Sequence, residues 1–215
     1  MSKTTRKWSA GAVLAAALCG ITVGGGRGAD DDEDPDVKAL KKAIAAAGAE
    51  VTKHLEKAGT SEFDALAPKI ARDHKIEATM KLMKPKSKGG LSIGKLVGAG
   101  HKDSIELLIR DYAIGEWAGT KGPTKKEVTD CNADLVKAAQ VTALIAQMTP
   151  TWTPTKSLPG GKTPEKWKAL TEDMKKYSAE LITAAKAKDE KAVSAVAKKL
   201  NNSCAECHKI FRDDK

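Results

Sequence analysis

The chain has 215 residues, with 37 Lys and Arg against 28 Asp and Glu and a formal net charge of +9. This length suits one domain of ordinary size, or one domain with an extension. Aromatic residues make up only 4% of the chain and do not interleave with the basic ones, which argues against nucleic-acid binding. The positive charge instead favours attraction of an acidic partner.

The N-terminus predicts a secretory signal peptide over residues 1–29. It begins with three basic residues and no acid, and the apolar run AVLAAALCGITVGGG follows. That run is shorter than the roughly 20 residues that a membrane-spanning helix needs, so we expect no stable membrane insertion after cleavage. The protein is therefore expected to be exported, in the periplasm or its equivalent, with a mature chain that opens on an acidic segment, residues 30–36.

Beyond this segment the sequence predicts an all-α chain. Apolar residues recur at steps of three and four, and no stretch alternates as a strand would. Capping signals at Asp103, Thr124, Thr163 and Asp189 indicate where the later helices begin. The predicted helices run from Val37 to Leu55, from Phe63 to about Met83 with an interruption at Pro68, from Asp103, from Thr124 to Pro150, from Pro164, and from Asp189 to Phe211.

The last three helices are joined by short or Pro-Gly connections, which predicts an antiparallel four-helix bundle. Either the helix from Asp103 or the helix from Asp36 could supply the fourth member, and the sequence leaves both open. A glycine-rich loop, Lys84–Gly100, separates the N-terminal helices from the rest. We expect one elaborated helical domain over residues 37–215.

The chain ends with the motif Cys204-Ala-Glu-Cys207-His208. Without the signal peptide three cysteines remain, an odd number that argues against a disulfide scaffold; the third, Cys131, lies on an apolar stripe and is expected to be a small buried residue. Thiols three residues apart on a helix point to the same side, which suits addition to the two vinyl groups of one haem. His208 can then reach the iron, and C-x-x-C-H is typical of c-type haem attachment.

Three other interpretations of this motif fit less well. A thioredoxin-like pair needs a βαβ setting, and no strands are predicted. A structural zinc site needs four ligands, and the chain offers no second Cys or His pair at a suitable spacing. A disulfide between Cys204 and Cys207 would be strained inside a helix.

The stretch C-A-E-C-H-K-I-F-R, which ends at Arg212, resembles the terminal motif of class II c-type cytochromes, the cytochrome c′ and cytochrome c556 group. The resemblance covers roughly residues 124–215. It implies one covalent haem c per chain, bound by Cys204 and Cys207, with His208 as the proximal iron ligand. It also implies that Arg212 lies near the haem propionates, although a cation at a helix C-terminus would equally explain Arg212. Related bundles often pair, so a homodimer is a further expectation.

The distal ligand cannot be carried over from this resemblance by position. Methionine occupies that place in the c556 type and an apolar residue in the c′ type, but here residues 30–123 precede the matching region. Met80 or Met83 is the leading candidate, and His54 is the alternative. Met148 and Met174 lie on helical stripes and are expected in the core. If the helix from Asp103 takes the first position, the candidates for the residue facing a five-coordinate iron are Leu107 and Leu108.

The function expected from these features is that of an electron carrier with one haem and a redox partner that docks through an acidic surface. The alternative is a five-coordinate haem protein that binds nitric oxide or carbon monoxide. An enzyme ranks third, because no distal acid-base residue is identifiable from the sequence.

Overall fold

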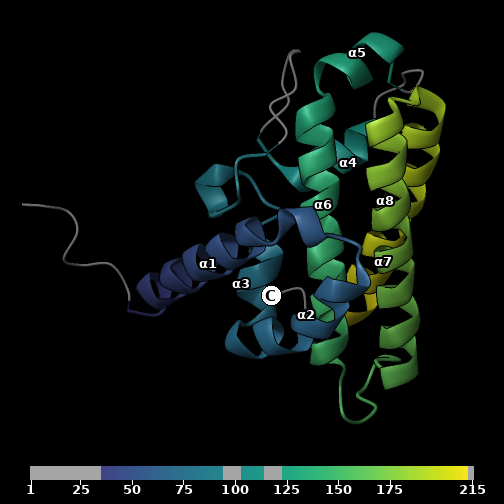
Figure 1. Cartoon of the computed structure of the whole chain (residues 1–215). Coiled ribbons are helices and arrows are strands. Elements are labelled where there is room, and N and C mark those ends of the chain that lie inside the picture. The colour runs from purple at the N-terminus through teal and green to yellow at the C-terminus, as the bar shows by residue number, and fades with distance from the viewer. Residues whose placement is uncertain (1–34, 94–102, 114–122, 213–215) are drawn as a thin grey trace, which may run out of the picture. The chain divides into compact units, whose positions relative to one another are not determined.

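The computed structural model describes residues 35–93, 103–113 and 123–212 (Figure 1). The predicted signal peptide, the acidic segment up to residue 34 and the glycine-rich loop beyond residue 93 lie outside the described residues. Contacts divide the chain into two units, Met1–Glu33 and Asp34–Lys215, and every described residue belongs to the second. Among the described helices, none has the length and apolar character needed to cross a membrane.

The described residues confirm the all-α prediction. The only β-type pairing among them is a single bridge between Leu158 and Lys162. The helices are α1 (Pro35–Lys53), α2 (Ser61–Asp73), α3 (Ile76–Lys81), α4 (Ile105–Tyr112), α5 (Lys125–Asp130), α6 (Asn132–Met148), α7 (Pro164–Ala187) and α8 (Glu190–Phe211), and short 3₁₀ turns are η1 (Leu55–Lys57), η2 (Lys86–Lys88) and η3 (Thr149–Trp152).

Side-chain caps start the later helices where the sequence predicted them. Thr124 forms a full capping box with Glu127 at the start of α5, and Thr163 caps α7 one residue before Pro164. Asp189 caps α8 by accepting two backbone hydrogen bonds. At α4 the prediction is one residue early, because Ser104 rather than Asp103 is the N-cap; the Asp103 carboxylate instead accepts a bond from the Ser92 hydroxyl at 2.8 Å.

Two predicted helix boundaries are wrong. Pro68 does not interrupt α2. The helix packs against α6 through its buried residues, and this packing stabilises α2 by more than the loss of the one backbone hydrogen bond that proline removes. The chain breaks instead at His74 and Lys75, both of which have extended backbone angles. The helix predicted from Thr124 to Pro150 is two helices, α5 and α6, which meet at the buried Cys131.

The helices α6, α7 and α8 lie side by side, and α6 stands between the other two and the N-terminal helices α1 and α2 (Figure 1). The helix α6 is buried at every position from Ala138 to Met148, because α7 covers one side of it and α2 and η3 cover another. Of the two candidates for a fourth helix, α4 packs against α8 and α6, whereas α1 packs against α3 and α6. The short α4 is thus the helix that meets the motif-bearing α8.

Candidate functional site

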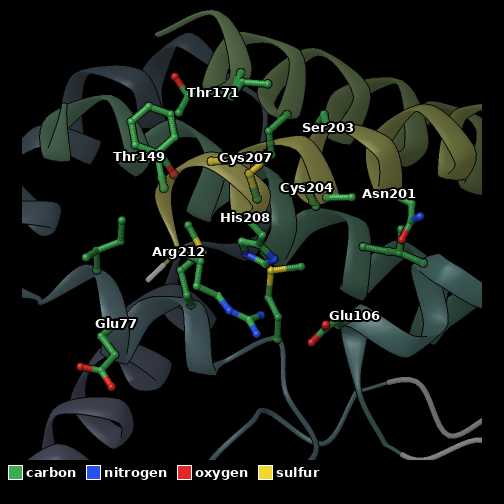
Figure 2. A pocket seen from close by; sticks show the side chains of 18 of the residues that line it. Glu77, Glu106, Thr149, Thr171, Asn201, Ser203, Cys204, Cys207, His208 and Arg212 are labelled. Carbon is green, nitrogen blue, oxygen red and sulfur yellow. The ribbon is translucent and has the colours of Figure 1, made fainter. Parts of the chain in front are cut away.

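A cavity of about 580 Å³ lies beside the C-terminal half of α8. Cys204, Cys207, His208 and Arg212 contribute one wall, and Figure 2 shows their side chains projecting from the end of α8 toward the same hollow. The register of the helix explains this placement, since residues three and four apart share one helix face. The terminal motif therefore forms one continuous surface inside a cavity.

The two thiols of this wall lie in a water-poor environment. Cys204 and Cys207 are free cysteines, each partly buried. Burial raises the pKa of Cys204 to about 12, with a smaller contribution from the neighbouring Cys207. Burial likewise raises the pKa of Cys207. Both side chains are therefore neutral thiols near pH 7.

His208 is exposed to the cavity, whose mouth opens to solvent. The surrounding walls still remove water from the ring, and this desolvation, followed by the positive charge of Arg212, lowers the pKa of His208. The imidazole is therefore neutral near pH 7, which is the form that can donate a lone pair to a metal.

A second wall comes from the end of α3 and the turn that follows. Met80 and Met83 both line the cavity, and Met83 is only 9% exposed. The backbone of this turn is held by the start of α4, because the Met83 carbonyl accepts hydrogen bonds from the Ser104 hydroxyl at 2.9 Å and from the Glu106 N–H at 3.1 Å. Two methionine thioethers therefore share a cavity with the His208 imidazole.

Apolar and aromatic side chains complete the cavity. Leu170 and Met174 come from α7 and Ile109 from α4. Trp167 packs edge-to-face on Phe211, with ring centroids 4.9 Å apart, and its indole N–H donates to the Thr149 carbonyl at 3.1 Å. This aromatic contact fixes the last turn of α8, and with it the direction of the motif.

Charged side chains stand at the cavity in pairs. The Lys84 ammonium pairs with the Glu106 carboxylate, and Lys81 pairs with Glu77 at 3.2 Å between nitrogen and oxygen. These four residues, together with Arg212, are the charged residues that line the cavity within the described part of the chain. A ligand with an apolar body and anionic groups would find both environments here.

The remaining sequence candidates lie elsewhere. His54 is not among the residues lining the cavity; its Nε2 lies 2.9 Å from Glu50 Oε1 and its ring packs on Phe63. Met148 and Met174 are both buried in the core, as expected, and Met174 also lines the cavity. Leu108 is buried in the core and Leu107 does not line the cavity; α4 contributes Glu106 and Ile109 instead.

Part of the chain matches a known protein family. Residues 122–212 match the family model described as Cytochrome C'. Over these residues the chain is similar to the cytochrome c′ family of class II c-type cytochromes. No curated protein and no solved structure matches the chain significantly. The match covers α5 to α8 and omits α1 to α4, so the methionine wall of the cavity lies outside the part of the chain that defines the family.

The residues present fit the haem that a cytochrome c′ region implies. The cavity has the size of a small-molecule site, and most of its surface is apolar, although polar and charged side chains also line it. Two thiols stand one helical turn apart beside a neutral imidazole. The iron of a bound haem supplies either one-electron redox chemistry or a binding position for a small molecule. The family match and these residues together support a c-type haem cytochrome.

Proposed function

We propose that this cytochrome is an exported single-haem electron carrier. Cys204 and Cys207 would hold the haem covalently through thioether bonds, and the neutral His208 would bind the iron from the proximal side. The presence of Met80 and Met83 in the same cavity as His208 is the observation that carries the proposal. A methionine sulfur as the sixth ligand raises the iron potential and suits electron transfer.

We propose complementary roles for the other residues of the cavity. Leu170, Met174, Ile109 and Trp167 would enclose the macrocycle and exclude water from its faces. Arg212 lies at the end of α8 among the charged residues of the cavity, where its guanidinium can meet the carboxylates of the haem. Catalysis is not part of the proposal.

Export and partner choice rest on the sequence and on the family. The predicted signal peptide supports a periplasmic location, and cytochromes c′ are generally exported. The positive net charge, with many exposed lysines along α7 and α8, supports docking of a redox partner that presents an acidic surface. Pairing of two copies through their helices remains part of the proposal.

One observation favours a second function, the binding of nitric oxide or carbon monoxide at a five-coordinate iron. The helix α4 packs against α8, and its Ile109 lines the cavity. An apolar residue in this position would leave the distal face of the iron without a ligand. The two proposals differ in which wall, the α3 turn or α4, approaches the iron.

The visible spectrum of the mature holoprotein, oxidised and reduced, with and without carbon monoxide, separates these two functions. The electron-carrier proposal expects a low-spin spectrum with the far-red band of a methionine–iron bond, and no change on adding the gas. A high-spin spectrum that shifts with carbon monoxide would overturn it in favour of the gas-binding protein.

A further inference from the structure

The methionine turn and α4 are joined by a cluster of contacts centred on Ser104. The Ser104 side chain is fully buried. Its hydroxyl donates to the Met83 carbonyl at 2.9 Å and accepts from the Leu107 N–H at 3.4 Å, so one side chain both caps α4 and holds the turn. The Glu106 N–H makes a second bond to the Met83 carbonyl at 3.1 Å.

Further contacts restrict the same turn. The Lys84 ammonium pairs with the Glu106 carboxylate, and the Leu91 N–H donates to the Leu82 carbonyl at 3.1 Å. The helix α4 in turn packs against α8, which carries the terminal motif. The path from the methionine wall to the His208 wall therefore runs through the first turn of α4.

We infer that Ser104 is a positioning residue that fixes the Met83 turn over the iron site. This inference rests on the proposed sulfur ligation and adds the element that sets its geometry. A ligand must be held by its supporting contacts within a few tenths of an ångström of the productive position. The Ser104 hydroxyl is the only side-chain donor to the backbone of this turn that the described residues provide.

The test compares Ser104→Ala with Ser194→Ala in the holoprotein. Ser194 is a matched control, because its buried hydroxyl donates to the Tyr112 carbonyl at 2.8 Å and thus holds the other end of the same helix, α4. Both variants lose one buried hydrogen bond from a hydroxyl to a carbonyl elsewhere in the chain, and Ser104→Ala also loses the N-cap bond from the Leu107 N–H. Their thermal unfolding, far-red band, reduction potential and carbon monoxide uptake are measured side by side.

Both variants are expected to unfold at lower temperature than the wild type. Only Ser104→Ala should weaken the far-red band, lower the reduction potential and increase the fraction of protein that takes up carbon monoxide about tenfold, a change equivalent to about 1.4 kcal/mol. Ser104→Gly provides a second variant, because glycine is an acceptable N-cap but supplies no hydroxyl to Met83. It should reproduce the spectral effect if Ser104→Ala does not fold.

The outcomes separate this inference from the proposed function. If the wild type shows the sulfur band and both Ser104 variants keep the wild-type band, potential and gas uptake, the inference is overturned while sulfur ligation stands. If Ser194→Ala changes these properties equally, the effect reports α4 packing in general, and the specific role of Ser104 is again overturned. If the wild type has no sulfur band, sulfur ligation and the inference fail together.

Discussion

Gln147 of α6 donates a hydrogen bond from Nε2 to the carboxylate of Asp64 in α2, at 2.9 Å. The same nitrogen donates to the Thr60 carbonyl at 2.9 Å, and Oε1 accepts from the Gly59 N–H at 2.8 Å. Lys175 of α7 also approaches Asp64, at 2.9 Å. One amide therefore joins the η1–α2 segment to the part of the chain that matches the cytochrome c′ family model.

Gln147→Ala should lower the free energy of unfolding by about 1–3 kcal/mol, because it leaves buried polar groups of the η1–α2 turn without their partner. Urea denaturation measures this loss. Gln140→Ala is the control, since Gln140 is also buried on α6 but makes none of these bonds. Equal losses from the two variants would show that the amide junction contributes nothing specific.

Asp64 should give the protein an acid-dependent component of stability. Partial burial opposes ionisation, but the hydrogen bonds from Gln147 and Lys175 and the Lys175 charge hold the pKa of Asp64 below its ordinary value of 3.8. A carboxyl with a lowered folded-state pKa contributes stability above its unfolded pKa and loses that contribution as the pH falls through the folded pKa.

The urea midpoint of the wild type should therefore fall more steeply below about pH 4 than that of Asp64→Asn. The control is Glu172→Gln, at an exposed position on α7, and its urea midpoint should change with pH as that of the wild type does. Parallel curves for the wild type and Asp64→Asn would contradict the assignment.

Gly90→Ala should disrupt the turn after α3. An added Cβ at Gly90 would overlap the carbonyl oxygen of Lys84. Because this is a backbone atom, the overlap can be relieved only if the backbone itself shifts. We expect a loss of at least about 1–3 kcal/mol in thermal or urea unfolding. Gly160→Ala is the comparison: its Cβ would meet nothing within 4 Å, so only its positive φ of 78° opposes the change, and the loss should be smaller.

Covalent attachment predicts a simple extraction result. Acid-acetone treatment of the denatured wild type should leave the haem on the polypeptide, whereas it should remove all haem from Cys204→Ser/Cys207→Ser. Cys131→Ser is the control, because Cys131 is buried where α5 meets α6, away from the cavity. Release of the haem from the wild type would refute thioether bonds.

The two methionines should respond differently to removal of their sulfur. Met83→Leu should abolish the far-red band and open the iron to carbon monoxide, since the Met83 backbone is the one fixed by two hydrogen bonds. Met80→Leu should keep the band. Either exchange should lower the free energy of unfolding by less than about 1.5 kcal/mol, because the side chains of methionine and leucine have similar volumes. Retention of the band in both variants would remove the α3 turn from the ligand set.

Local signals in the sequence were sufficient for much of the fold. Thr124, Thr163 and Asp189 predicted helix starts correctly because capping depends on a few adjacent residues. Pro68 misled the prediction because packing of α2 on α6 tolerates a residue that an isolated helix would not. The choice of α4 as the partner of α8 depends on contacts between distant segments, which helical periodicity does not encode.

For the candidate site too, local sequence signals predicted some residues, while others depend on contacts between distant segments. Cys204, Cys207 and His208 are adjacent in sequence, so their spacing alone predicted a shared surface. Met80 and Met83 could only be named as candidates, because nothing local indicates that α3 folds toward α8. Glu106, Lys84 and Ser104 were not predicted as site residues, because each looks like an ordinary helix-start or loop residue until the α3 turn is seen to pack on α4.

The cavity walls are far apart along the chain, and this has a consequence for how the fold is held. The methionine turn and the terminal motif enclose a loop of roughly 120 residues. In the chain-entropy description, a link that closes a loop of about 100 residues restricts the unfolded chain by an amount worth about 4.7 kcal/mol. A haem bound by residues of both walls would act as such a link. The prosthetic group would then also stabilise the fold, by restricting the unfolded chain between the methionine turn and the terminal motif.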